Sequence, residues 1–428
     1  MLFEPLQGVA EYEKILLPAE CSRGPRAPTR GEPSYFIGEL MEIRIDEVRD
    51  RSDLRDFVRF SYSLYSNHRC WVPPFFSDEL DLFRPKTNPA YEFCEVACWI
   101  ARAGSEAVGR IAGIINHRSN QIHGEKRARF GWIDFIDDSR VSRALLSTVE
   151  DWAMAHGMDA VHGPLGFTDL DPEGMLVEGF DELGTIATIY NHEYYPAHMV
   201  KCGYSKDMDW VEFEVLVPEK MPERVARIAA IAQKRLNLTP LKVRKAKELL
   251  PFKEEVFSLL NESFSGLYGF VPLTEKQVEV YATKFFGYLN PKFVSIILDS
   301  DLRVAAFGIT IPSLSRALQR CRGRLFPFGA LHILRALRRN DTVDLYLIAV
   351  RHDVQGRGVN ALILDQLGNT FREMGIQRAE TNPELEHNLR VIRQWSEFDH
   401  RQHKRRRCFV KKLDQQSGVR GADPTVRQ

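Results

Sequence analysis

The sequence predicts an α/β protein, more closely an α+β one, built from two domains with the same plan. Its 428 residues exceed what one hydrophobic core usually holds and fit two domains of about 200 residues each. Hydrophobic residues make up 44% of the chain and charged residues 27%, a composition typical of globular proteins. Segments that alternate like strands and segments with helical periodicity follow one another in an order that occurs twice.

In the first half, turn residues separate the expected strands from the expected helices. The ranges 96–104 and 106–117 predict a hairpin across a glycine-containing turn. The range 139–157 predicts a strong helix, which Ser139 would cap at its start and Gly157 would end. The other expected elements are helices over 54–66 and 194–204, and strands over 41–48, 129–136, 159–165 and 209–218.

The second half repeats this order, which indicates an internal duplication of pattern although residue identity between the halves is low. A hairpin is expected over 292–311, a strand over 342–350, and a long helix over 356–375 that ends at Gly375. The join between the halves falls at about Pro218 to Pro222. The remaining elements are helices over 246–264, 274–289 and 388–398, and strands over 376–381 and 405–413.

Both ends of the chain are expected to be flexible. Residues 1–40 contain a stretch rich in Pro, Gly and Arg, and residues 414–428 are polar and carry no periodic pattern. The start has no basic region ahead of an apolar core, so it is a poor signal peptide. No run of about 18 apolar residues occurs, which predicts no membrane span and favours a cytoplasmic location.

Charge and cysteine usage narrow the choice of partners. The formal net charge is zero, so any electrostatic argument must be local. Of the seven cysteines only Cys94 and Cys98 lie close in sequence, and no His/Cys pair nearby completes a zinc site. An acidic stretch that starts at Asp169 resembles a calcium loop, but its twelfth position is Phe180 instead of Glu. We therefore expect no metal.

A glycine-rich turn, Gln355-Gly356-Arg357-Gly358, lies between the apolar strand 342–350 and the following helix. A turn that opens a helix directs several unpaired backbone N–H groups to one point, where the helix dipole favours negative charge. The glycines keep side chains away from that point. The turn thus predicts an anion site that fits a pyrophosphate, although it matches neither a Walker loop nor a G-x-G-x-x-G turn.

This strand, loop and helix resemble motif A of the GNAT acyltransferases, whose pattern is Q/R-x-x-G-x-G/A. Gln355 and Gly358 match, while Asn360 stands where the family has Gly or Ala. The resemblance implies two tandem GNAT-like domains, each a mixed, mostly antiparallel sheet flanked by helices. Their bounds would be 41–218 and 219–413, and the first lacks a glycine loop at its equivalent point, 135–145.

The resemblance also implies a donor, acyl-CoA or an acylated carrier protein, with coenzyme A bound as substrate. In the family the loop amides hold the pyrophosphate, and an asparagine often lies near the pantetheine. The implied donor-binding residues are Ala349, Val350, Gln355, Gly356, Arg357, Gly358, Val359, Asn360 and Asn388.

N-acyl transfer needs a neutral amine, a polarised carbonyl and a proton for the thiolate. Asp344 and Tyr346 share a facing on the motif A strand and are candidate catalytic residues. Glu178 and His192 of the first half are further candidates. The tyrosine that the family often has after the last helix is missing, since the region from Phe398 to Phe409 contains none.

A dense polar cluster in the first half predicts an acceptor pocket, because long irregular segments are often functional. The alternative is a solvated loop whose acids cap helices. Asn116 and His117, at the end of an expected strand, are also candidates, although a lone histidine there is more often structural. The other candidate acceptor residues are Asp169, Glu173, Glu178, Tyr190, Asn191, His192 and Tyr195.

Residues 302–340 contain eight arginines and no acidic residue. Within them, 325–339 is amphipathic, which suits contact with an anionic membrane at its inner face or with an acidic partner such as acyl carrier protein. The alternative is an ordinary helix that covers the sheet.

These observations favour an N-acyltransferase that moves an acyl group to an amine acceptor. Tandem chains of this kind resemble the bacterial N-acyltransferases that form ceramides, which implies a sphingoid base as acceptor. One alternative is a non-catalytic GNAT-like binding or scaffold protein. Another is an aminoacyl-tRNA-dependent transferase, but that function needs a larger basic face, so we expect no nucleic acid.

Overall fold

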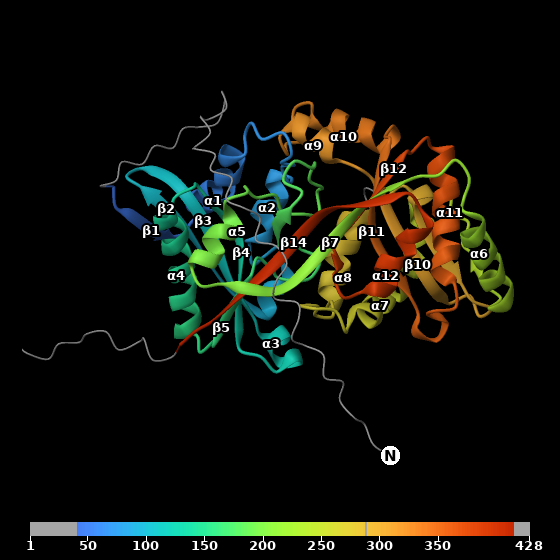
Figure 1. The fold of residues 1–428 in the computed structure, drawn as a ribbon, viewed down its shortest axis with the longest axis horizontal. Coiled ribbons are helices and arrows are strands. Elements are labelled where there is room, and N and C mark those ends of the chain that lie inside the picture. Colours follow the sequence, from blue (N-terminus) through green and yellow to red (C-terminus); the bar gives the residue numbers. More distant parts are fainter. Residues whose placement is uncertain (1–40, 287–288, 415–428) are drawn as a thin grey trace, which may run out of the picture. The chain divides into compact units, whose positions relative to one another are not determined.

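The computed structural model describes residues 41–286 and 289–414 (Figure 1). The predicted lead 1–40 and residues 415–428 of the predicted tail lie outside this part. A 14-stranded, mostly antiparallel sheet runs through the described chain, with helices on both faces. No helix within the described ranges is long and apolar enough to cross a membrane.

The first half follows the predicted order, with additional short elements. Its strands are β1 (Ile43–Glu47), β2 (Cys94–Ala103), β3 (Glu106–Asn116), β4 (Arg127–Phe135), β5 (Ala160–Gly163), β6 (Met175–Glu178) and β7 (Ser205–Leu216). Its helices are α1 (Arg51–Leu64), α2 (Phe76–Leu82), η1 (Pro89–Glu92), α3 (His117–His123), α4 (Ser139–Ala155) and α5 (Tyr195–Lys201).

The second half begins with a helix, α6, that the sequence prediction missed. Its strands are β8 (Thr239–Pro240), β9 (Val294–Leu298), β10 (Val304–Pro312), β11 (Thr342–Val350), β12 (Arg378–Thr381), β13 (Glu384–Leu385) and β14 (His400–Lys412). Its longer helices are α6 (Glu223–Arg235), α7 (Lys253–Phe264), α8 (Glu275–Phe286), α9 (Ser315–Cys321), α10 (Gly329–Arg338) and α11 (Val359–Glu373). Its shorter helices are η2 (Ala246–Phe252), η3 (Pro291–Phe293), η4 (His352–Val354), α12 (Leu389–Ile392) and η5 (Arg393–Glu397).

Local corrections concern helix ends. The N-cap of α4 is Asp138 and not Ser139, because the Asp138 carboxylate accepts a hydrogen bond from the Arg140 amide at 2.8 Å. Gly157 follows the C-cap with a left-handed φ of 75°, as predicted. The predicted helix 388–398 is a single α-helical turn continued by a 3₁₀ turn.

The two halves exchange their last strands within the sheet. The order is β1-β2-β3-β4-β5-β14-β7-β12-β11-β10-β9-β8. Strand β14, from the end of the chain, pairs with β5 of the first half, while β7 of the first half pairs with β12 of the second. In Figure 1 the long strands β7 (green) and β14 (red) run side by side, in agreement with their antiparallel register. Each half is therefore completed by a strand of the other.

Charged side chains are buried where the exchanged strands meet. Glu212 on β7 forms an ion pair with Arg406 of β14, and its second oxygen lies 3.7 Å from the Lys404 ammonium. Lys404 also binds Glu380 of β12. Burial works against ionisation of Glu212, but Arg406 and Lys404 hold its pKa below its usual value. The network thus joins three strands from the two halves.

We predict that Arg406→Met lowers the free energy of unfolding by about 3–5 kcal/mol, because it leaves the buried Glu212 without its main counter-charge. Arg401, on the same strand, pairs with Glu182 and Glu214 at the surface, so Arg401→Met should cost less than about 1 kcal/mol. Urea unfolding of the two variants measures the difference. Equal losses would contradict a structural role for the buried network.

Candidate active site

A gap opens between β11 and β12 in the second half. The two strands pair in parallel from Thr342 with Arg378 to Leu345 with Thr381, where β12 ends. Strand β11 continues to Val350, paired on its other side with β10. Since neighbouring residues of a strand direct their N–H groups to opposite edges, part of the backbone beyond Leu345 faces this gap.

A β-bulge at Tyr346 sets the shape of the gap. Leu345 pairs with Thr310 and Leu347 with Ile309, so Tyr346 is the extra residue on β11. The Asn382 side chain donates a hydrogen bond to the Tyr346 carbonyl at 3.0 Å, and the Asn382 amide donates one to the Leu345 carbonyl at 3.2 Å. These two bonds hold the chain after β12 against the bulge.

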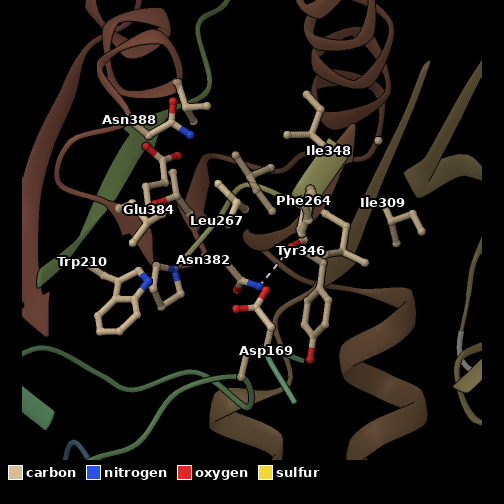
Figure 2. A pocket seen from close by; sticks show the side chains of 18 of the residues that line it. Asp169, Trp210, Phe264, Leu267, Ile309, Tyr346, Ile348, Asn382, Glu384 and Asn388 are labelled. Carbon is tan, nitrogen blue, oxygen red and sulfur yellow. Dashed lines mark hydrogen bonds between the residues drawn. The ribbon is translucent and has the colours of Figure 1, made fainter. Parts of the chain in front are cut away.

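A cavity of about 230 Å³ lies at this gap, with walls from both halves of the chain. Figure 2 shows Asp169 of the first half directed toward Asn382 and Tyr346 of the second. Strands β10 and β11 and helix α11 contribute mostly apolar side chains to its lining, and polar groups of both halves complete it. The lining includes Asp169, Asp171, Glu173, Trp210, Tyr268, Tyr346, Asn382, Glu384, Asn388 and Trp395.

The first half contributes three carboxylates to the cavity, Asp169, Asp171 and Glu173. Burial raises the pKa of Asp169 to about 7, with a smaller rise from Asp171 and an opposing effect of Arg129. Burial, and then the charge of Asp169, raise the pKa of Glu173 well above its usual value. Burial thus favours the protonated form of Glu173, and near pH 7 Asp169 is poised to exchange a proton.

Arg129 fixes the loop that carries these acids. Its buried guanidinium donates to the Gly166 carbonyl and to the Gly269 carbonyl, each at 3.0 Å. Gly269 belongs to the second half, so Arg129 ties the acidic loop to both parts of the chain. Asn116 supports the same loop, since its amide donates to the Phe167 carbonyl at 2.9 Å.

Glu384 is a fourth acid in the cavity, from the short strand β13. Burial raises its pKa to about 8, opposed by a hydrogen bond that Trp395 Nε1 donates at 2.9 Å. Tyr268, in the loop after α7 of the second half, also lines the cavity, and its hydroxyl donates to Asp207 of the first half at 2.6 Å. Burial raises the pKa of Tyr268 above its usual value, so the ring is neutral.

The glycine loop lies at the end of β11, before α11, as predicted. Gly356 and Gly358 have left-handed φ angles of 70° and 90°. Gly358 is the N-cap of α11 and offers no side-chain cap to the first amides of the helix. Gln355 fixes the loop by donating to the Val350 carbonyl at 2.9 Å, and Arg357 is exposed. Val359 is buried and Asn360 is partly buried in the first turn of α11.

Four of the sequence-predicted site residues meet at the cavity. These residues are Asp169, Glu173, Tyr346 and Asn388. Asp344, Ala349 and Val350 lie on the same strand as Tyr346 but are buried beside the cavity and do not line it. Burial, and then Glu380, raise the pKa of Asp344 to about 8. Burial, and then Asp344, raise the pKa of Tyr346.

The structure does not bring the other first-half candidates into the cavity, which corrects the prediction of a single acceptor pocket. Glu178 is exposed and pairs with Arg405 at 3.3 Å. The His192 ring stacks on Tyr194 in an aromatic cluster, and burial lowers its pKa to about 4. His117 is exposed, 2.6 Å from Glu95.

Three further candidates have structural partners. The Tyr190 hydroxyl donates to the Phe180 carbonyl at 2.9 Å, and that of Tyr195 accepts from the Phe135 amide at 2.8 Å. The Asn191 amide group exchanges two hydrogen bonds with the Leu176 backbone, at 2.6 and 3.0 Å. Asn116 likewise caps α3 through the Ser119 amide. The polar groups of these residues therefore bind the backbone of the protein itself.

Sequence reasoning missed several cavity residues because each lies outside any motif. Trp210 is on β7, Tyr268 is in the loop after α7, and Asn382 and Glu384 follow β12. Asn382 and Glu384 come directly after the strand predicted over 376–381, next to the motif A strand. Their position at the end of that strand could have marked Asn382 and Glu384 as candidate site residues.

A second, apolar cavity of about 70 Å³ adjoins the first. It lies under α7 and α8, and Tyr346, Leu347 and Ile309 line both spaces. Most of its remaining lining is aliphatic or aromatic, for example Leu260 and Ala282. The cavity that contains the acids therefore shares part of its wall with an apolar cavity.

The first half repeats the gap in its own part of the sheet, with a smaller cavity. Strand β4 pairs with β5 only from Arg127 to Arg129 and then continues to Phe135. The cavity there is about 90 Å³, and Tyr65, Trp71 and Trp132 are among its lining. Strand β4 leads to α4 without a glycine loop.

Two groups of side chains in the described chain have the spacing of metal ligands: His162 with Asp207 and Cys408, and Glu212 with Glu380 and His403. Arg127 and Tyr268 already bind the Asp207 carboxylate, and cationic side chains bind both glutamates of the second group. These carboxylates therefore have counter-charges without a metal ion.

Comparison with known proteins defines the fold. The chain matches the solved structure of a tandem GNAT protein from the clavulanic acid biosynthesis pathway with a TM-score of 0.51 and 11% identity, covering 87% of this chain and 99% of that one. The chain thus has the tandem GNAT fold, and the resemblance predicted from Gln355 to Gly358 is confirmed at the level of fold. No protein-family model matches it.

Two curated relatives are more similar in sequence. The chain is 26% identical over 374 residues to Protein YghO of Escherichia coli, covering 85% of this chain and 94% of the relative. It is also 26% identical over 309 residues to Bacterial ceramide synthase of Caulobacter vibrioides, covering 71% and 78%.

The two glycines of the loop predict different costs of substitution. A Cβ on Gly358 would lie 2.7 Å from Ile228 Cγ2 of α6, whereas a Cβ on Gly356 meets nothing within 4 Å. Gly356→Ala should lower the free energy of unfolding by about 1 kcal/mol, the cost of a left-handed φ for alanine. Gly358→Ala should lower it by about a further 1–3 kcal/mol, because its Cβ would overlap Ile228. Urea unfolding checks this, and equal costs would contradict the close approach of α6.

Asp344 predicts a pH-dependent stability. Its folded pKa of about 8 lies above the ordinary 3.8, so its contribution is present at low pH and is lost as the pH rises to 8. As the pH rises from 3.8 to about 8, the free energy of unfolding of Asp344→Asn should increase relative to that of the wild type, by up to about 1.4 kcal/mol per pH unit. Urea midpoints of the variant and the wild type, measured at about pH 5 and about pH 8, test this. A pH-independent difference would contradict burial of the ionised carboxylate.

Proposed function

We propose that the protein is an N-acyltransferase, which moves an acyl group from an acyl thioester to an amine. The observation that carries this proposal is the cavity at the β11–β12 gap, where the strand that leads to the glycine loop faces the acidic loop of the other half. The donor and the acceptor would approach this cavity from opposite sides. The GNAT fold supports a coenzyme A thioester as donor.

The donor side consists of β11, the glycine loop and α11. The uncapped first amides of α11 suit a pyrophosphate, and exposed Arg357 adds a positive charge. From there a pantetheine arm would follow the open edge of β11 to the bulge at Tyr346. Asn388 lines the cavity and is a candidate contact of this arm. A backbone N–H at the gap would polarise the thioester carbonyl.

The acceptor side consists of Asp169, Asp171 and Glu173, with Glu384 opposite. Acids that are costly to ionise in a buried site gain most from a positively charged ligand, which fits an ammonium group. A base works best when its pKa lies near the working pH, and the value of about 7 for Asp169 meets this condition. Asp169 is therefore the proposed general base.

The chemistry follows from these positions. Asp169 removes one proton from the ammonium, and the neutral nitrogen then forms a bond to the thioester carbon. The carbon–sulfur bond breaks, and the second proton lost by the nitrogen is balanced by one gained by the thiolate. Tyr346, kept protonated by its raised pKa, is the candidate donor of that proton. The products are an amide and a thiol.

The apolar cavity beyond Tyr346 supports an acyl group longer than acetyl. We further propose a long-chain amino alcohol, or sphingoid base, as the acceptor, so that the product is a ceramide. The support is the similarity to the Caulobacter protein named Bacterial ceramide synthase, together with the apolar walls beside the acids. Release of thiol from palmitoyl-coenzyme A in the presence of sphinganine, and mass detection of the amide, test both substrates.

Asp169→Asn should lower kcat/KM by about a hundredfold or more, because it removes the proposed base but keeps its shape. The wild-type rate should rise with pH through about 7, as Asp169 loses its proton, and the variant should lack this rise. Glu178→Gln is the matched control, since Glu178 is exposed outside the cavity. Equal activity of Asp169→Asn and wild type would contradict the assignment.

Ala282→Leu should shift the donor preference toward shorter acyl groups. The added carbons enter the apolar cavity under α8, where Ala282 is buried, and take up space that a long chain would need. Thiol release measured with acetyl-, octanoyl- and palmitoyl-coenzyme A gives the profile. An unchanged profile would place the acyl chain elsewhere.

Binding of coenzyme A without transfer to any amine would instead favour a non-catalytic binding protein.

A further inference from the structure

The connection between β10 and β11 forms an exposed surface that the proposed chemistry does not use. It contains α9, the turn 322–328 and α10, and we refer to it as the α9–α10 face. Five large apolar side chains on it are exposed to solvent, and seven arginines surround them. The apolar residues are Leu325, Phe326, Phe328, Leu331 and Leu334. The exposed arginines are Arg316, Arg320, Arg322, Arg324, Arg335, Arg338 and Arg339.

The degree of exposure is unusual for aromatic side chains. Phe326 is 88% exposed, Phe328 69% and Leu331 64%. Isolated apolar residues on a surface are common, but five within ten positions form a contiguous segment of the kind that marks an interaction site.

The face is held in place from below, so its exposure is not that of a loose segment. Ile333 of α10 and Leu318 of α9 pack in a core with Phe75 of the first half. Gln319 donates hydrogen bonds to the Arg69 and Trp71 carbonyls at 2.8 and 2.9 Å. One side of α10 therefore covers the protein, as an ordinary helix would, while Leu331 and Leu334 point outward.

The segment that carries these residues has charges of one sign only. No Asp or Glu occurs from 302 to 340. In the part of the chain that the structure describes, none of the seven arginines forms a salt bridge. Arginines that are not neutralised by the protein are available to an external anion.

We propose that the α9–α10 face docks on an anionic lipid bilayer. Arginine guanidinium groups bind lipid phosphates, and phenylalanine and leucine side chains of an interfacial helix enter the boundary between headgroups and acyl chains. A bilayer matches both properties at once, because it offers a layer of negative charge directly over an apolar interior. An acidic protein surface would match the arginines but would leave Phe326 and Phe328 without an apolar layer to enter.

The α9–α10 face lies in the connection between two strands that line the cavity. The connection that carries the face leaves β10 after Pro312 and returns to β11 at Thr342, and both strands line the cavity. A lipid surface bound there would be in contact with the segment that joins these two strands. This inference does not depend on the proposed acyl transfer.

Flotation of the full chain with lipid vesicles tests the proposal. The wild type should bind vesicles of phosphatidylcholine mixed with phosphatidylglycerol, and bind pure phosphatidylcholine at least about tenfold less, with binding to the mixture weakened by added salt. The double substitution Phe326→Ser with Phe328→Ser, and the triple substitution Arg335→Gln, Arg338→Gln and Arg339→Gln, should each reduce binding about tenfold or more. Val200→Ser, at an exposed apolar position on α5, should bind like the wild type.

Unchanged unfolding midpoints would show that the substituted proteins are intact. Absence of wild-type binding to anionic vesicles would overturn the proposal, as would equal binding of all variants. Binding to acyl carrier protein but not to vesicles would also overturn it and would identify the face as a protein-docking surface. None of these results affects the proposed function, which the thiol-release assay tests separately.

Discussion

The pairing of β7 with β14 is the interaction on which the rest of the structure depends. Each strand comes from one half of the chain and completes the sheet of the other, so neither half has a full sheet without its counterpart. The buried ion pair of Glu212 with Arg406, extended through Lys404 to Glu380, satisfies the charges that this exchange brings inside. Val211 and Phe213 of β7 pack in the core around α11, so the hydrophobic core is shared in the same way.

The exchange explains why both halves of the chain line the cavity. Strand β11 provides the open edge of the proposed donor site, and the loop that follows β11 provides its glycines. The acidic loop with Asp169 comes from the first half, and Arg129 holds it against Gly269 of the second. The equivalent gap of the first half has a smaller cavity of about 90 Å³ and no glycine loop, while the loop after β5 supplies the acids.

The sequence predicted the elements well where the pattern was local. Alternation located β2 and β3, and helical periodicity with Gly157 located α4. The glycine loop led to the correct fold, because its meaning depends on the adjacent strand and helix. Periodicity carries no information about which strands pair, so the exchange was not predictable. The placement of Glu384 depends on the pairing of β13 with β7, and the bulge at Tyr346 depends on the register of β10 with β11. Tyr190 and Asn191 were misplaced because their polar groups bind the nearby backbone of Phe180 and Leu176, which periodicity does not reveal.

The central claim is that an acyl thioester and an amine meet between Tyr346 and Asp169. A crystal structure of the protein with a long-chain acyl-coenzyme A thioether, in which the carbonyl is replaced by a methylene, tests it most directly. We expect the pyrophosphate at the turn from Gln355 to Gly358, the sulfur in the gap beside Tyr346, and the alkyl chain in the apolar cavity with Leu260. A ligand bound in the first-half gap, or one whose sulfur lies away from Asp169, would contradict the account.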